Sequence, residues 1–250
     1  MCRTAGMNKY YYDLHIHSCL SPCADDDMTP ANIAGMGVIN GLQIMALTDH
    51  NTCGNCPAFF KACKAYGIIP IPGMELTTAE DIHVVCLFPT LELAMDFDAE
   101  IKPRILPIKN RPDIFGNQLL MDENDVIIDT PQTLLISATD LDIGSAVELV
   151  KKMGGVCYPA HIDRPSNGII TTLGDIPGEY GFTCVEFKDP QNEKPYREKY
   201  AAVKNAASVI SSDAHHLWDI NEQGNFLMIE DEPYSSAFVR QNLLFNIIKN

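Results

Sequence analysis

The chain of 250 residues combines a large apolar fraction with a strongly acidic balance of charge. Apolar residues make up 46% and charged residues 20%, which is the composition of an ordinary globular domain. The formal net charge is −15, and such a surface repels nucleic-acid backbones, so we expect no extensive nucleic-acid binding. Apolar runs stay below the roughly 20 residues that a membrane span needs, and residues 1–9 lack a signal-peptide core. We therefore predict a cytoplasmic protein without membrane contact.

Strand-like and helix-like segments alternate along most of the chain. The aromatic and β-branched run 10–16 predicts a strand, and Thr29 followed by Pro30 predicts the start of a helix that ends near Asn40. Further strands are expected at 42–48, 68–72, 82–88, 156–159, 183–187, 207–211 and 225–229, and further helices at 57–66, 90–101, from Asp140 or Asp142 to Gly154, 195–206 and 234–248. This alternation predicts one domain, 1–250, with an α/β sheet or barrel.

The alternation breaks over residues 102–140, which hold prolines, scattered charges and only short apolar runs. We interpret this stretch as an insertion with a small hairpin. Its first part carries Lys102, Arg104, Lys109 and Arg111, four of the chain's 18 basic residues. They form either a solvated loop paired with the acidic stretch 122–125, or a basic lid that attracts an anionic substrate.

Cysteines are numerous but carry little functional signal. There are nine, and reduced thiols are expected in the absence of an export signal. Cys53 and Cys56 form a CxxC pair directly after a histidine motif, a spacing found in redox sites and zinc knuckles. Without a second CxxC of matching spacing, small buried hydrophobes are the favoured interpretation.

Histidines carry the strongest signal. Five of the seven fall at or just after the end of a predicted strand: His15, His17, His50, His161 and His215. In barrels of parallel strands that end carries the active site. His15 and His17 have the i, i+2 spacing that places two side chains on one face of a strand, and so do Asp213 and His215. Imidazoles and carboxylates delivered to one rim from several strands predict a multinuclear metal site.

The motifs resemble those of the PHP family, the polymerase and histidinol phosphatase domain. They are DLHIHS (13–18), LTDHN (47–51), GMELT (73–77), HVVCLF (83–88), PAHID (159–163) and SSDAHH (211–216), in family order. The resemblance implies a distorted, TIM-barrel-like barrel of seven β/α units. It also implies an enzyme that hydrolyses phosphoric ester bonds at metal ions bound beyond the strand ends.

The resemblance implies a set of nine ligands and assigns most of the catalytic work to four of them. The catalytic residues would be His15, His17, Glu75 and Asp213, with Glu75 bridging two ions. The full ligand set would be His15, His17, Asp25, His50, Glu75, His83, His161, Asp213 and His215. Imidazole with carboxylate suits Zn, Mn or Fe, so two to three divalent transition-metal ions are expected.

The loop ligand is the least secure member, because residues 21–30 depart from the short family loop. Counting back from Pro30 places Asp25 at the expected position, with Asp26 as its competitor. Asp27 fits a solvated helix entry instead.

Residues near the motifs are candidates for supporting parts. Asp49, next to a ligand, could orient His50 or His17. Arg164, three residues after His161, is our first candidate for a phosphate clamp, against the alternative of a surface pair with Asp163. The remaining substrate-facing candidates are Lys188 and His216.

The favoured function is hydrolysis of a small phosphorylated metabolite or nucleotide by a metal-bound hydroxide. Two alternatives stay open: a nuclease for short oligonucleotides, and a metal-stabilised binding domain without catalysis. The sequence leaves open the substrate, the metal and the oligomeric state.

Overall fold

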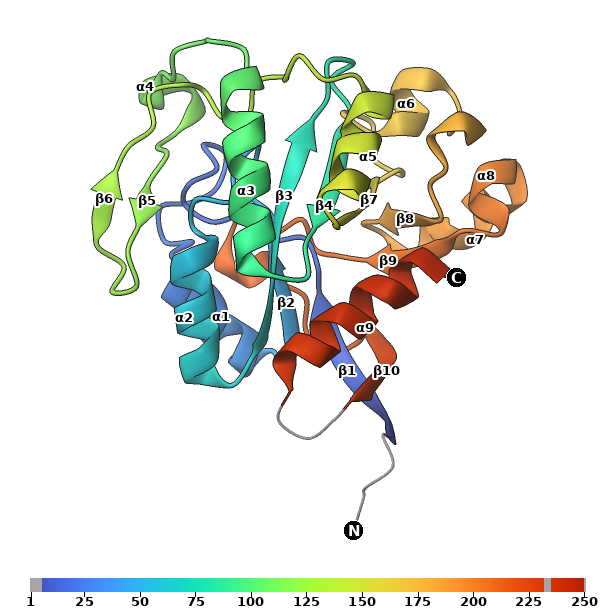
Figure 1. The fold of residues 1–250 in the computed structure, drawn as a ribbon, viewed down its shortest axis with the longest axis horizontal. Coiled ribbons are helices and arrows are strands. Elements are labelled where there is room, and N and C mark those ends of the chain that lie inside the picture. The colour runs from blue at the N-terminus through green and yellow to red at the C-terminus, as the bar shows by residue number, and fades with distance from the viewer. Residues whose placement is uncertain (1–5, 232–234, 250) are drawn as a thin grey trace.

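The computed structural model describes residues 6–231 and 235–249 as a curled sheet surrounded by helices (Figure 1). Its strands are β1 (Gly6–Asp13), β2 (Ile44–Leu47), β3 (Ile69–Thr77), β4 (His83–Leu87), β7 (Val156–Pro159), β8 (Cys184–Phe187), β9 (Ala207–Ile210) and β10 (Phe226–Asp231). Its longer helices are α1 (Pro30–Ile39), α2 (Cys56–Tyr66), α3 (Leu91–Ile101), α5 (Ile143–Lys152) and α9 (Ser236–Lys249). None of the helices in these ranges is both long and apolar enough to cross a membrane.

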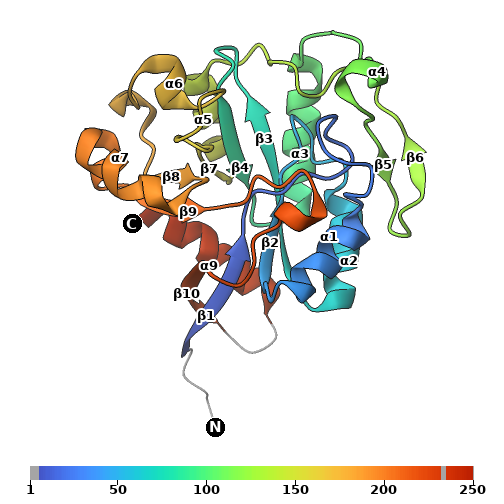
Figure 2. The ribbon, with the colours of Figure 1, turned by 180° about the vertical axis from the view of Figure 1, so that it is seen from behind.

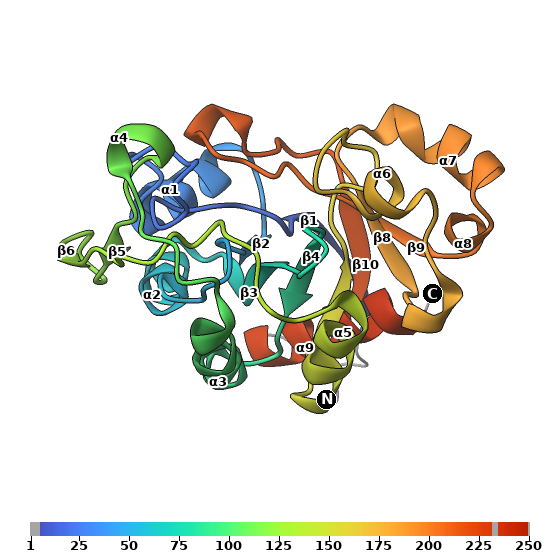
Figure 3. The same ribbon diagram turned by 90° about the horizontal axis from the view of Figure 1, so that it is seen from above.

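Six strands form one sheet in the order β10-β1-β2-β3-β4-β7, and β8 pairs with β9 in a second sheet. The view from above shows the larger sheet curling into half a barrel (Figure 3). The predicted α/β class and distorted barrel are confirmed at this level. Alternation is less uniform than predicted, because β4 runs antiparallel to both β3 and β7. A closed ring of seven β/α units stays a prediction.

Two apolar layers enclose the sheet, and the strand period of two decides which side chain joins which layer. In β2, Ile44 and Ala46 join the layer that packs on α9, whereas Met45 and Leu47 join the layer under the other helices. Helix α9 crosses the lower part of the strands in Figure 1, away from the end toward which β3 points. That leaves the C-terminal rim of the strands free for polar groups.

Local sequence signals explain most boundaries. Thr29 caps α1 by accepting a hydrogen bond from the Asn32 amide, and Asp142 caps α5 in the same way. Strand β1 ends at Asp13, three residues earlier than expected, because its ladder with β2 ends there. The single helix expected at 195–206 is two short ones, α7 (Glu193–Lys199) and α8 (Ala201–Lys204), since Tyr200 between them is extended.

Several short elements are not expected from the sequence. They are α6 (Ile169–Leu173) and the 3-10 turns η1 (Lys102–Arg104), η2 (Gly178–Tyr180), η3 (Pro190–Asn192) and η4 (Leu217–Asp219).

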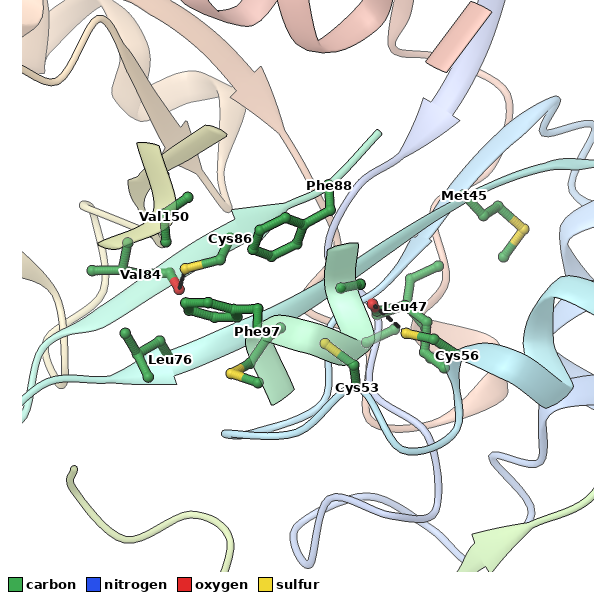
Figure 4. Packing of buried hydrophobic residues seen from close by; sticks show 14 of the residues in the cluster. Met45, Leu47, Cys53, Cys56, Leu76, Val84, Cys86, Phe88, Phe97 and Val150 are labelled. Carbon is green, nitrogen blue, oxygen red and sulfur yellow. Dashed lines mark hydrogen bonds between the residues drawn. The ribbon is translucent and has the colours of Figure 1, made fainter. Parts of the chain in front are cut away.

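Both cysteines of the CxxC pair lie in the core. Cys53 and Cys56 are 0% and 1% exposed among Leu47 and other apolar side chains (Figure 4). The Cys53 thiol donates to the Gly73 carbonyl at 3.2 Å, and burial raises its pKa well above the ordinary value. A thiol that stays protonated and shielded from solvent is a packing group, in line with the favoured interpretation.

The stretch 102–140 contains helix α4 (Pro112–Phe115) and the predicted hairpin, β5 (Leu120–Met121) with β6 (Ile127–Asp129). It is fastened to the loop that follows the HxH motif. The Leu119 amide donates to the Cys19 carbonyl at 2.8 Å, and the Asn117 amide group donates to the Asp26 carboxylate. Figure 2 shows this green stretch beside the blue loop. The insertion therefore helps to shape the surface next to the candidate site.

Gly116 tests this attachment. Its φ is +96°, and a Cβ there would overlap the carbonyl oxygen of Pro22. We expect Gly116→Ala to lower the free energy of unfolding by about 2–4 kcal/mol, from backbone strain and overlap together. Gly174→Ala is the matched control, since φ is +83° there but nothing lies within 4 Å of the added atom. Urea denaturation measures both, and equal losses would contradict the attachment.

Candidate metal centre

Glu75 lies at the centre of a cluster of imidazoles. It is 1% exposed and is carried by β3 close to that strand's C-terminal end. Five histidines place a ring nitrogen 2.8–3.3 Å from one of its two carboxylate oxygens: His15, His17, His50, His83 and His161. Such crowding around one buried carboxylate is the arrangement expected of a bridging metal ligand.

Asp213 supplies a second carboxylate on the other side of His15 and His17. Its Oδ1 lies 3.5 Å from His15 Nε2, 3.2 Å from His17 Nε2 and 3.7 Å from His215 Nδ1. The His215 ring stacks on that of His17, with centroids 4.3 Å apart. The structure thus brings together eight of the nine predicted ligands, all except Asp25.

Three features of the fold produce this convergence. The loops after β1 and β9 lie side by side, since the His17 amide donates to the Ala214 carbonyl at 3.0 Å. An isolated parallel bridge joins His50 to Glu75. His83 begins its strand instead of ending one, and the antiparallel register pairs it with Thr77, so it reaches the same rim.

The backbone is strained at two of these residues. His161 has φ +26° and Asp213 has φ +49°, in the left-handed region that non-glycine residues rarely adopt. Such conformations cost about 1–3 kcal/mol each and persist where the surroundings enforce them. Here they turn both side chains toward Glu75 directly after β7 and β9.

The donor set fits metal ions. Three groups of donor atoms lie close enough together to hold an ion: His17, His50 and His215; His15, His17, Glu75 and Asp213; and His50, Glu75 and His83. Within the described residues, His50 Nε2 is buried without a hydrogen-bond partner, a costly state that a bound cation would relieve. Mixed nitrogen and oxygen donors favour Zn, Mn or Fe over Ca or Mg.

Buried charges in the cluster balance one another. Burial disfavours the charged form of every group in the cluster. For Glu75, the interactions with His83, His15 and His50 are stronger than this effect of burial, so they hold the pKa of its carboxyl well below the usual range. For His15, burial is likewise outweighed by Glu186, Glu75 and Asp213, so its pKa is raised, as is that of His17.

Two imidazoles remain neutral. Burial, helped by the nearby His17, lowers the pKa of His50 to about 4 and that of His215 to about 3. They are therefore ready to ligate, whereas His15 and His17 must first give up protons.

Glu186 is a part of the site that the sequence interpretation missed. It is 1% exposed on β8, and its Oε1 lies 2.8 Å from His15 Nδ1 while accepting the His161 amide at 3.0 Å. A carboxylate of this kind fixes the tautomer and direction of a ligand imidazole. The sequence feature that could have revealed Glu186 is its position as an acidic residue inside the otherwise apolar strand 184–187.

Asp49 interacts with the neighbouring histidines indirectly, through hydrogen bonds to serine residues. Its carboxylate accepts hydrogen bonds from the Ser18 amide, the Ser18 hydroxyl and the Ser21 hydroxyl. Ser21 Oγ in turn lies 2.9 Å from His17 Nδ1 and accepts the His50 amide at 3.1 Å. The predicted orientation of His17 and His50 by Asp49 is thus indirect.

Asp25 lies at the rim. Its carboxylate contacts His216 Nδ1 at 2.6 Å and its amide donates to the His215 carbonyl at 3.0 Å. Its competitor Asp26 is bound by Asn117, and Asp27 is exposed. Neither Asp25 nor Asp26 belongs to the donor groups named above.

Both predicted phosphate-binding cations lie beside Asp213. Arg164 Nη1 pairs with Asp213 Oδ2, not with Asp163, and Lys188 Nζ lies 3.9 Å from the same oxygen. The Arg164 side chain is 36% exposed and the Lys188 side chain is 47% exposed. Each of them therefore lies partly in solvent and partly against Asp213 of the cluster.

Two of the four basic residues of the insertion have nearby partners. Arg104 pairs with Asp140 at 3.6 Å and Arg111 with Asp113 at 2.8 Å, whereas Glu123 of the acidic stretch pairs with Lys61. These two arginines therefore do not make the expected pairs with 122–125, and the lid hypothesis depends on Lys102 and Lys109.

Comparison with known proteins places this centre in a family. The PHP domain family matches residues 13–214, so the chain belongs to it. In sequence, 79 residues are 34% identical to a 5′-3′ exoribonuclease of Haemophilus influenzae, a match that spans 30% of this chain and 28% of that enzyme.

Solved structures share the fold at low identity. The lesion-specific endonuclease EndoQ of Pyrococcus furiosus is 17% identical with a TM-score of 0.66, over 94% of this chain and 55% of that one. A candidate metal-dependent phosphoesterase of Bifidobacterium adolescentis is 18% identical with a TM-score of 0.60, over 93% and 95% of the two chains. The chain therefore spans about half of EndoQ and nearly all of the second protein.

Removing the charge of Glu186 tests its orienting role. Glu186→Gln leaves the ligand set intact but weakens the hold on His15, so we expect metal affinity to fall by about 10- to 100-fold. Competition with a chelator measures this affinity. Glu193→Gln, which alters a carboxylate paired with Arg197 on α7, should leave it unchanged. Equal affinities for Glu186→Gln and wild type would exclude the role.

Metal binding should also release protons. Because the pKa of His15 is raised well above its ordinary value and that of His17 is raised too, an ion would have to displace protons from this pair. Because both pKa values are raised, protons already compete near neutral pH, so apparent metal affinity should fall as the pH drops from above neutrality. Titration calorimetry in buffers of different ionisation enthalpy counts the protons. A binding enthalpy independent of the buffer would contradict the expected charge state.

Proposed function

We propose that this chain is a metal-dependent hydrolase of phosphate esters. The observation that carries the proposal is the cluster itself, two buried carboxylates in contact with six imidazoles. The three overlapping donor groups support two to three divalent ions, with Zn, Mn and Fe as the favoured elements. Bound ions would neutralise phosphoryl oxygens and activate water near neutral pH.

The chain's own residues would divide the remaining work. Glu75 and Asp213 are the only carboxylates in the donor groups found among the described residues, so they would hold ions on both sides of His15 and His17. Glu186 and the Asp49–Ser21 pair would keep His15 and His17 pointed inward.

Arg164 and Lys188 would bind the phosphoryl group of the substrate. Both side chains pair with Asp213 and are partly exposed, so they also face the solvent from which a substrate would enter. A guanidinium offers the planar fork that phosphate oxygens accept, and an ammonium adds a point charge. Water would then add its oxygen to phosphorus, while the ester oxygen leaves as an alcohol.

The favoured substrate is a small phosphorylated metabolite or a nucleotide. A nuclease is the second candidate, supported by the fold shared with EndoQ, one of whose structures holds a 27-mer duplex with an abasic lesion. That likeness weakens the expectation of no nucleic-acid contact. The net charge of −15 still argues against long polymers. A purely structural metal domain is less favoured, because it has no need of partly exposed cations beside the centre.

Ligand variants test the proposal. His15→Ala and Asp213→Ala should lower metal-dependent phosphate release by more than about 100-fold, since even partners outside the ligand set contribute about 10- to 100-fold. A panel of phosphate monoesters and diesters, assayed with added Mn²⁺ or Zn²⁺, measures the loss. Circular dichroism should show folded variants, and Glu148→Ala on the exposed face of α5 should keep full activity. If both ligand variants retained most activity, the centre would not be the site of hydrolysis.

A further inference from the structure

Trp218 is the chain's single tryptophan, and most of its side chain lies in solvent. It is 74% exposed on the short turn η4, which follows the last metal-centre motif. Its ring lies flat on His216, with centroids 4.8 Å apart and planes inclined by 4°. One face of the indole is thus covered by an imidazole, while the exposed fraction leaves room for a second ring on the other.

This ring pair is fixed to the edge of the metal centre. His216 directly follows the candidate ligand His215, and its Nδ1 contacts the Asp25 carboxylate at 2.6 Å. Asp25 is itself held by its amide, which donates to the His215 carbonyl at 3.0 Å. A stacked pair tied down in this way loses little conformational entropy when a ligand binds.

The indole ring of Trp218 is not part of the hydrophobic core. Turn η4 is anchored by Ile220, which is 2% exposed and whose carbonyl accepts a hydrogen bond from the Asn40 side chain at 2.8 Å. In Figure 2 the orange-red turn lies beside α1, which Asn40 caps. Tryptophan is enriched at binding surfaces, because its ring offers a large apolar face together with a polar N–H, so this indole on an anchored turn beside the metal centre is a candidate binding surface.

We propose that Trp218, backed by His216, is a stacking platform for the nucleobase of the ester that the metal centre hydrolyses. The proposal rests on the proposed function and narrows its substrate to nucleotides. Every nucleobase has a planar face that stacks on an aromatic ring, so the platform would accept different bases. The base would lie on Trp218 while the phosphate reaches Arg164 and the ions.

The surface beyond the platform favours one nucleotide over a long strand. A hollow of about 620 Å³ lies between loop 22–27 and α4, and its lining includes Asp25, Asp26 and Asp27. Three carboxylates there would repel the phosphates of a continuing chain. We therefore expect mononucleotides and very short oligonucleotides to be the ligands.

Matched ligands separate the base from the phosphate. Adenosine 5′-monophosphate and ribose 5-phosphate carry the same anion, but only the former can stack. We expect calorimetry on the metal-free protein to show the nucleotide binding about tenfold more tightly or better. Because Trp218 is the single tryptophan, its fluorescence should be quenched by the nucleotide and not by ribose 5-phosphate.

Substitutions of Trp218 test whether its ring is the surface on which the nucleobase stacks. Trp218→Ala should remove the preference for the nucleotide, whereas Trp218→Phe, which keeps a stacking ring, should retain most of it. Phe226→Ala is the matched control, because that aromatic side chain is 46% exposed on β10 and should not affect binding. Equal affinities for the two ligands in the wild type, no binding of either, or an unchanged preference in Trp218→Ala would each overturn the platform.

This binding measurement is independent of hydrolysis. Base-dependent quenching in a protein that releases no phosphate from any ester would refute the proposed function and leave the platform standing. Hydrolysis without base preference would refute the platform alone.

Discussion

The burial of Glu75 among five imidazoles is the constraint on which the rest of the site depends. An isolated carboxylate in such a place would be expensive to ionise, so its charge must be met by neighbouring cations. Raised pKa values at His15 and His17 supply them in the metal-free protein. Metal ions would replace those protons with stronger and fixed positive charge. The atoms that balance the charge of Glu75 are thus the atoms that would bind the ions.

The polar side chains of the metal centre stay close together because residues that are not themselves candidate ligands hold them in position. Glu186 holds His15, and Asp49 holds His17 through Ser21. The insertion adds a further layer, because its Leu119 amide is hydrogen-bonded to the loop after the HxH motif. Strained backbone at the motifs after β7 and β9 is tolerated because these neighbours enforce it. The centre is therefore built from strand ends and from the loops after them, which neighbouring residues hold in place.

Substrate specificity would come from side chains at the edge of the metal centre that are still exposed to solvent. Arg164 and Lys188 stand on the Asp213 side, and the Trp218–His216 pair stands beyond Asp25. A fold shared with an endonuclease and with a smaller phosphoesterase-like protein is compatible with many substrates. This chain combines an acidic balance of charge with one exposed indole beside the centre.

The sequence alone predicted eight of the side chains that the structure brings together and most of the elements, because HxH spacing and strand-end motifs are local features of the chain. It also predicted Thr29 as a helix cap and narrowed the cap of α5 to Asp140 or Asp142, of which the structure shows Asp142, since capping depends on neighbours in sequence. Tertiary structure decided the rest. The antiparallel direction of β4, the partner of Arg164 and the link from Asp25 to His216 join residues distant in the chain. Such contacts follow from sheet register and loop packing, which no local pattern encodes.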